Sequence, residues 1–131
     1  MTDDEFLQAF MDCTLPNDQF HHRDHLRLVW LQVRRLGLKA ARDAVADGIR
    51  RFATSTGHTE KYHETMTEFW IRLVDHMIHL RSDIQDFDCF LATYPQLADK
   101  HLPLRHWQSE TMFSPAARAG WIEPDLLPLA W

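Results

Sequence analysis

Three histidines occupy helical positions at which apolar residues are expected. His22 and His25 lie three residues apart in the segment HHRDHLRLVWLQVRRL, and His63 lies in a second amphipathic segment, KYHETMTEFWIRLV. At about 100° per residue, each histidine falls on the apolar stripe of its own segment. A buried imidazole needs a hydrogen-bond partner, a metal ion or a catalytic role, because an unpartnered buried polar group is costly. These three residues are therefore the first candidates for chemistry.

Two histidines one turn apart on a helix, joined by a third from a facing helix, can supply three nitrogen ligands to one metal ion. The sequence predicts such a divalent-metal site on His22, His25 and His63, with one position left for water or substrate. Zinc is the first expectation, and iron, nickel, copper and manganese stay open because imidazole binds all of them. Glu60 is a candidate fourth ligand, since it forms a Glu-x-x-His spacing with His63. Glu64 is the other candidate, although on a regular helix it points about 100° away from His63. Asp24 could orient an imidazole.

Two kinds of reaction fit such a metal site. A metal-bound water could attack an ester, amide or phosphoester, with Glu64 or Glu60 as the general base. Alternatively, the metal could activate a thiol or another substrate for transfer. Without a metal, His22 or His63 could act as an acid–base residue, with Tyr62 as the proton donor. Glu64 and Tyr62 are therefore the predicted catalytic residues of a hydrolase or transferase acting on a small molecule.

A second interpretation treats the three histidines as structural. A His-x-x-His spacing is a weak signal in a chain with nine histidines, and the stronger His-Glu-x-x-His motif is absent. The rings would then be hydrogen-bonded in the core of a non-catalytic small-molecule-binding or accessory protein. His76 and His79 repeat the three-residue spacing but are predicted on the polar side of their helix, as solvated side chains. The sequence leaves open whether the protein is an enzyme.

The elements that would position these residues are almost all helical. Thr2 and Glu5 have the spacing of a capping box, Gly37 is a helix stop, and Thr59 is a candidate cap. Asp86 is expected to cap the helix at residues 87–94, and Ser114-Pro115 is a cap-then-proline start for the helix at residues 115–119. Gly48 lies in the middle of a helix and predicts a close approach to a neighbouring element. Four longer helices are expected at residues 2–13, 21–36, 39–55, and 60–80 or 63–80. Three short ones are expected at residues 87–94, 97–101 and 115–119.

The predicted fold is all-α, with a four-helix core, short C-terminal helices and an extended tail over residues 121–131. The tail contains two prolines and two tryptophans, and its apolar residues predict that it packs on the bundle. With 131 residues, of which 45% are hydrophobic and 25% charged, the chain is expected to form one domain, residues 1–131.

Composition also indicates the compartment. No apolar run reaches the roughly 20 residues that a membrane span requires. The acidic, helix-like start MTDDEFLQAF does not fit a secretory signal, and two cysteines do not make a disulfide framework. We therefore expect a cytoplasmic protein that does not bind membranes.

Charge is distributed unevenly along the chain. Residues 1–20 carry a net charge of −5, residues 21–51 carry +5, and residues 52–131 carry −5. The basic segment could dock an acidic partner or an anionic ligand, although solvated helix faces are the preferred interpretation. An acidic chain without a recognised binding motif is not expected to bind nucleic acid. A small-molecule ligand and a homo-oligomer both stay open.

The segments FHHRDHLRLVW (20–30), KYHETMTEFW (61–70) and WIEPDL (121–126) resemble a group of small bacterial helical proteins. These proteins carry a His-x-x-His-Leu segment followed by a Tyr-His-Glu-Thr segment. The resemblance covers most of the chain and supports the choice of candidate residues, but it implies no particular reaction. A looser similarity in architecture links the chain to the DinB-like metal-binding bundles, which present three histidines from four helices. Two ligands only three residues apart depart from that pattern.

Overall fold

All 131 residues are described by the computed structural model, which divides the chain into two units, Met1–Tyr62 and His63–Trp131. Both units are helical and neither contains a strand, which confirms the all-α prediction. None of the helices combines the length and the apolar character that crossing a membrane requires. The organisation of residues 1–131 as one domain stays a prediction.

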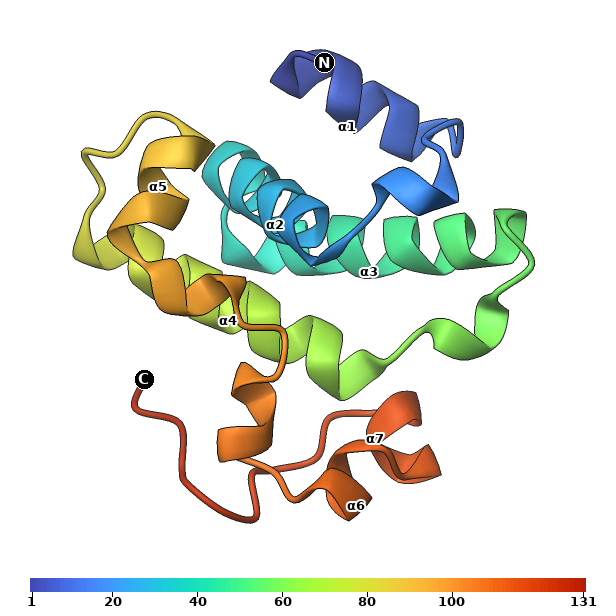
Figure 1. Ribbon diagram of the computed structural model, residues 1–131, viewed down its shortest axis with the longest axis vertical. Coiled ribbons are helices and arrows are strands. Elements are labelled where there is room, and N and C mark those ends of the chain that lie inside the picture. Colours follow the sequence, from blue (N-terminus) through green and yellow to red (C-terminus); the bar gives the residue numbers. More distant parts are fainter. The chain divides into compact units, whose positions relative to one another are not determined.

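Three α-helices build the N-terminal unit. They are α1 (Asp3–Met11), α2 (His22–Leu36) and α3 (Leu38–Ser55), and short 3-10 turns lie at Asn17–Gln19 and Thr59–Lys61. Gly37 separates α2 from α3 with a φ of +81°, a conformation that favours glycine. The helices α2 and α3 pack against each other, and Figure 1 looks nearly along α2 while α3 lies across the page.

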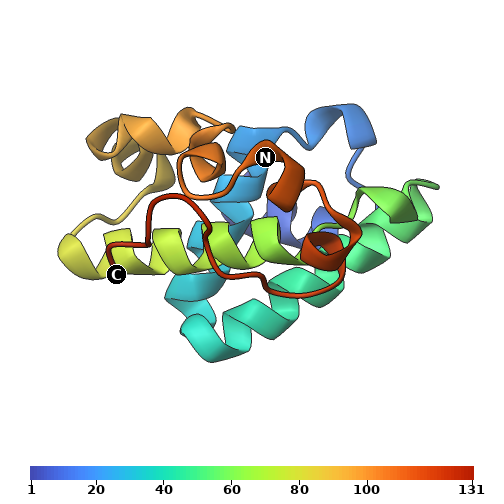
Figure 2. The ribbon, with the colours of Figure 1, turned by 90° about the horizontal axis from the view of Figure 1, so that it is seen from below.

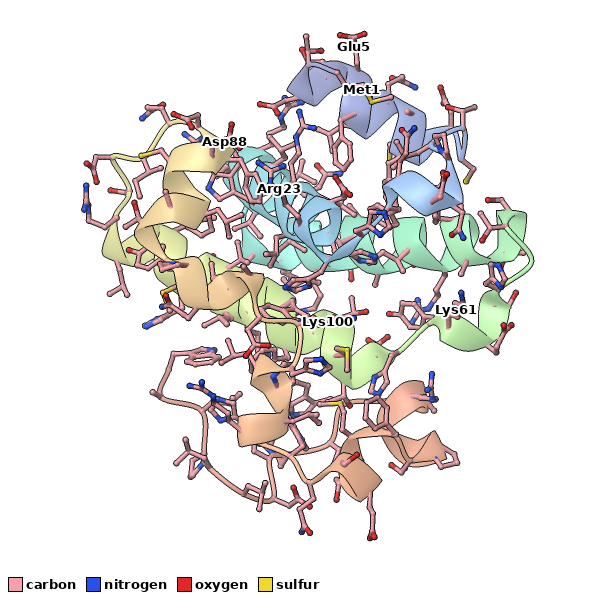
Figure 3. All side chains as sticks on the ribbon, in the orientation of Figure 1. Met1, Glu5, Arg23, Lys61, Asp88 and Lys100 are labelled. Carbon is pink, nitrogen blue, oxygen red and sulfur yellow. The ribbon has the colours of Figure 1, made fainter.

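The capping box at the start of α1 is confirmed. The Oγ1 atom of Thr2 accepts a hydrogen bond from the backbone N–H of Glu5, and the Glu5 carboxylate accepts one from the backbone N–H of Thr2, both at 3.1 Å. Glu5 lies on the outer side of α1, away from the other two helices of the unit (Figure 3). These two bonds satisfy N–H groups that have no partner inside the helix.

Acidic residues of α1 pair with basic residues of α2. Arg27 donates to Asp3 Oδ1 through both Nε, at 3.1 Å, and Nη2, at 2.7 Å, and Arg35 Nη2 lies 2.7 Å from Asp4 Oδ1. All four side chains are partly exposed, so each pair contributes only about 0.2–1 kcal/mol to stability. The acidic start of the chain thus engages two arginines of the basic segment within the same unit.

Aromatic rings fill the space beside α3. Phe10 of α1 stacks on Phe52 of α3 with ring centroids 5.9 Å apart, and Phe20 contacts both rings. A Cβ atom added at Gly48 would lie 2.5 Å from Cε2 of Phe10. The predicted close approach at Gly48 is therefore confirmed, and the neighbour is an aromatic ring.

The substitution Gly48→Ala is expected to lower the free energy of unfolding by about 1–2 kcal/mol. Forcing a methyl group against the buried ring of Phe10 costs about 1–3 kcal/mol, and the higher helix propensity of alanine returns at most about 1 kcal/mol. Gly120→Ala is the matched control, because open space surrounds Gly120, and its effect should stay below about 0.5 kcal/mol. Urea denaturation measures both. Equal stability of Gly48→Ala and the wild type would show that Phe10 moves aside without cost.

The C-terminal unit begins with one long helix and continues with short ones. These are α4 (Glu64–Leu80), α5 (Phe87–Thr93), α6 (Ser109–Met112) and α7 (Pro115–Ala119), with 3-10 turns at Pro95–Ala98 and Leu102–Arg105. The predicted cap of α5 is observed, since Asp86 Oδ1 accepts from the backbone N–H of Cys89 at 2.8 Å. The predicted Ser114-Pro115 start of α7 is also observed, with Ser114 Oγ accepting from Ala117 at 3.2 Å.

The expected cap of α4 is wrong. Thr59 begins a separate 3-10 turn, and His63 is the residue whose side chain caps α4. The expected turn at residues 97–101 overlaps the end of the 3-10 turn Pro95–Ala98, and a second 3-10 turn follows at Leu102–Arg105. The helix α6 has no counterpart among the predicted elements.

The tail runs along α4, from the first turn of that helix towards its C-terminal end (Figure 2). At the start of the tail, Thr65 Oγ1 donates to the carbonyl of Gly120 at 2.7 Å and accepts from the backbone N–H of Ile122 at 3.2 Å. At its end, the ring of Trp131 stacks on His76. The prediction of an extended, packed tail is confirmed. His79 is exposed, as predicted, whereas His76 is only partly solvated, because it is half-buried with Trp131 stacked on its ring.

Candidate functional site

His63 has both ring nitrogens engaged in hydrogen bonds inside the C-terminal unit. Its Nδ1 atom accepts from the backbone N–H of Met66 at 3.1 Å, and its Nε2 atom lies 2.5 Å from the carbonyl oxygen of Met112. Because Nδ1 accepts, it carries no hydrogen, and Nε2–H is the donor to Met112. With this tautomer, neither nitrogen offers a free lone pair to a metal ion.

The surroundings of His63 favour its neutral form. The side chain is buried, with 7% of its surface exposed. Burial lowers the pKa of His63 below its ordinary value, and the positive charge of Arg118 lowers it further, against the opposing effect of the bond to Met112. A neutral ring is also what the two hydrogen bonds require, since a protonated ring could not accept from Met66.

His22 and His25 lie on the first turn of α2. His22 is the first residue of the helix and His25 follows three residues later. Both side chains are half-buried. Asp24, a candidate for orienting an imidazole, accepts from the backbone N–H of His21, with Oδ2 at 3.0 Å. That bond fixes the start of α2, and so it holds the two histidines at the helix end.

His25 combines an apolar contact with unused hydrogen-bonding atoms. Its ring stacks on Phe20, with centroids 4.0 Å apart and planes 24° apart. The hydrogen bonds of the N-terminal unit include none to a ring nitrogen of His25. Burial lowers the pKa of His25 to about 4, and the nearby His22 contributes to the same shift. The ring is therefore neutral near pH 7, with one N–H donor and one lone pair available.

The predicted acid–base residues are divided between the two units. Tyr62 closes the N-terminal unit and is half-buried, with the guanidinium carbon of Arg50 lying 4.6 Å from the centroid of its ring. Glu60 is exposed, with Oε1 3.7 Å from Nδ1 of His58. Glu64 is the first residue of α4, in the C-terminal unit, and is half-buried.

The predicted metal ligands are divided in the same way, because His22 and His25 belong to the N-terminal unit and His63 opens the C-terminal unit. Within each unit, no group of three or more His, Cys, Asp or Glu side chains is arranged to hold a metal ion. The three-histidine site stays a prediction, as do the catalytic roles of Glu64 and Tyr62.

One buried carboxylate was not identified from the sequence. Glu68 of α4 is 7% exposed and accepts a hydrogen bond from Arg72 Nε at 2.9 Å, while the guanidinium of Arg72 lies 4.1 Å from the ring centroid of Trp121. The Glu-x-x-x-Arg spacing is the sequence signal that could have found this pair, since residues four apart on a helix are neighbours. Its geometry is that of a contact that holds the tail against α4.

The chain matches no protein-family model, no curated protein and no solved structure.

Proposed function

We propose that this is a small cytoplasmic, non-catalytic binding or accessory protein, in which His63 is a structural residue and His25 contacts a small-molecule ligand. The observation that carries this proposal is the pair of backbone hydrogen bonds that occupies both nitrogens of His63. His25 differs in that its neutral ring has a donor and an acceptor without partners in its unit. A ligand with one polar group could bond this ring while its apolar part lies against Phe20.

A metal-dependent hydrolase or transferase is the second candidate, and His25 is the observation that favours it. A neutral imidazole with an unused lone pair is the form that binds a divalent metal, and His22 lies one turn away. This candidate requires the four-helix core predicted from the sequence, with α2 facing α4. It also requires His63 to exchange its bonds to Met66 and Met112 for a metal ion such as zinc. Glu64 and Tyr62 would then be the base and the proton donor.

Thermal-shift measurements distinguish the two candidates. The protein without an affinity tag is melted with zinc, with other divalent ions and with a library of small polar organic molecules, alongside His25→Leu and the exposed-site control His79→Leu. We expect an organic ligand at ten times its Kd to add about 1.4 kcal/mol, or about 4–6 °C in Tm, to the wild type and the control but not to His25→Leu.

Two results of the thermal-shift measurements would contradict the binding-protein proposal. Stabilisation by stoichiometric zinc that is lost in both His25→Leu and His63→Asn would exclude the binding-protein proposal and establish the metal site. A library in which every stabilising compound acts equally on His25→Leu would show that His25 is not the contact residue.

A further inference from the structure

Three rings of the C-terminal unit hold the last residue of the chain. The indole of Trp131 stacks on the imidazole of His76, with centroids 5.6 Å apart and planes 21° apart. Its centroid also lies 6.0 Å from that of Phe69 and 6.2 Å from that of His106. Phe69 is fully buried and His106 is buried, whereas Trp131 remains 37% exposed. We call the rings of Phe69, His76 and His106 the Trp131 seat.

The inner part of the tail, residues 121–125, is firmly attached together with Gly120, which precedes it. Thr65 holds both Gly120 and Ile122, and the indole N–H of Trp107 donates to the Ile122 carbonyl at 2.9 Å. Asp125 then accepts from the backbone N–H of Gln108 at 2.8 Å and from Thr111 Oγ1 at 2.5 Å. These bonds, the one from Thr111 first, lower the pKa of Asp125 below its ordinary value and keep it ionised.

Hydrogen bonds and ring contacts attach the outer part of the tail, residues 126–131, at two places. The first is His106, whose carbonyl accepts from the backbone N–H of Leu126 at 2.9 Å and whose Nδ1–H donates to the Leu127 carbonyl at 2.8 Å. The second is the Trp131 seat. The side chains of Leu126 and Leu127 are 53% and 56% exposed, so the leucines at the start of this segment contribute little burial. Asp125 is therefore the point from which the outer segment can detach while the inner segment stays in place.

We propose that the Trp131 seat is a binding site for an apolar segment that carries a tryptophan, filled here by the chain's own tail and open to exchange with the tail of a second copy. The occupant is already defined by the molecule, since every copy carries both the seat and Trp131. Exchange of identical elements between copies needs no new contact, only a point of detachment such as the one after Asp125.

The attachment is weak enough for exchange. One aromatic anchor with two backbone hydrogen bonds corresponds to a peptide Kd on the order of 1 mM. The tail of the same chain competes at an effective concentration of several mM, so it fills the seat at low protein concentration. Trans occupation then grows as the protein concentration approaches the mM range.

The test uses the complete chain with the substitution Trp131→Ala, which empties the seat. Isotope-labelled protein is titrated with a peptide of residues 125–131 (DLLPLAW) and followed by amide chemical shifts. We expect saturable shifts at Phe69, His76 and His106, and an apparent affinity at least about fivefold weaker in the wild type, whose own tail competes. A peptide with alanine in place of tryptophan should bind at least about tenfold more weakly.

Matched variants locate the site. In the Trp131→Ala background, His76→Ala should weaken peptide binding about three- to tenfold, whereas His79→Ala, one turn further along α4, should not change it. Equal shifts in the wild type and in Trp131→Ala, or equal binding of the peptide that lacks tryptophan, would overturn the proposal. If Trp131→Ala does not fold, the translational diffusion of the wild-type protein is measured instead, from about 20 μM to about 1 mM. We expect association that grows with protein concentration. A protein that stays monomeric over this range would overturn the proposal.

Discussion

Replacing His63 with alanine is expected to lower the free energy of unfolding by about 3 kcal/mol. The alanine removes the acceptor for the Met66 N–H, and loss of a helix N-cap costs about 1 kcal/mol. It also removes the donor to the carbonyl of Met112, a residue that is fully buried, and a buried group left without its partner costs about 1–3 kcal/mol. Urea denaturation near pH 7.5, followed by circular dichroism, measures the loss.

His63→Asn separates the two contributions. The asparagine Oδ1 atom can still cap α4, but the side chain is too short to keep the bond to Met112, so about half of the loss should return. His79→Ala is the control on the exposed side of the same helix, with an effect below about 0.5 kcal/mol. If His63→Ala were as stable as this control, the two backbone bonds would contribute nothing to stability, and the structural role of His63 would have to be abandoned.

Most helix ends could be predicted because their signals are local. The Thr2–Glu5 box, the Asp86 cap and the Ser114-Pro115 start depend on residues within three or four positions of each other. The residue that caps α4 could not be predicted in this way, although residue 63 is one of the two starts that the sequence indicates. His63 caps the helix through Nδ1, and the carbonyl of Met112, 49 residues later, fixes the tautomer that makes Nδ1 an acceptor.

The sequence could identify which histidines of the candidate site are buried, but not which groups they contact. The apolar stripe correctly indicates that His63 is buried, yet periodicity says nothing about which groups meet its nitrogens. The same reasoning missed the partner of the half-buried His76, because Trp131, which stacks on it, lies 55 positions away in an extended segment. Helical periodicity describes one helix at a time, and these contacts come from packing between elements distant in the sequence.

The N-terminal unit is expected to lose stability as the pH falls, because of His25. Burial, assisted by the neighbouring His22, lowers the folded-state pKa of His25 to about 4, whereas the pKa of an unfolded histidine is about 6.5. Between pH 6.5 and pH 4, His25 is therefore protonated in the unfolded chain but neutral in the folded chain, and this proton uptake favours unfolding. The stability is complete above pH 6.5 and falls by up to about 1.4 kcal/mol per pH unit until pH 4.

The total loss assigned to His25 is about 2–3 kcal/mol, somewhat less than the full pKa difference implies, because the half-buried ring is partly screened by water. His25→Gln isolates it, since glutamine stays neutral at every pH. We expect the stability difference between wild type and His25→Gln to shift by this amount between pH 7 and pH 4 in urea denaturation, and His79→Gln to show no such shift. His63, whose pKa is also lowered, acts in the same direction in both proteins and cancels in the comparison. Parallel pH profiles for wild type and His25→Gln would mean that the folded chain accommodates the imidazolium, and the ring that we propose as a neutral ligand contact would be charged instead.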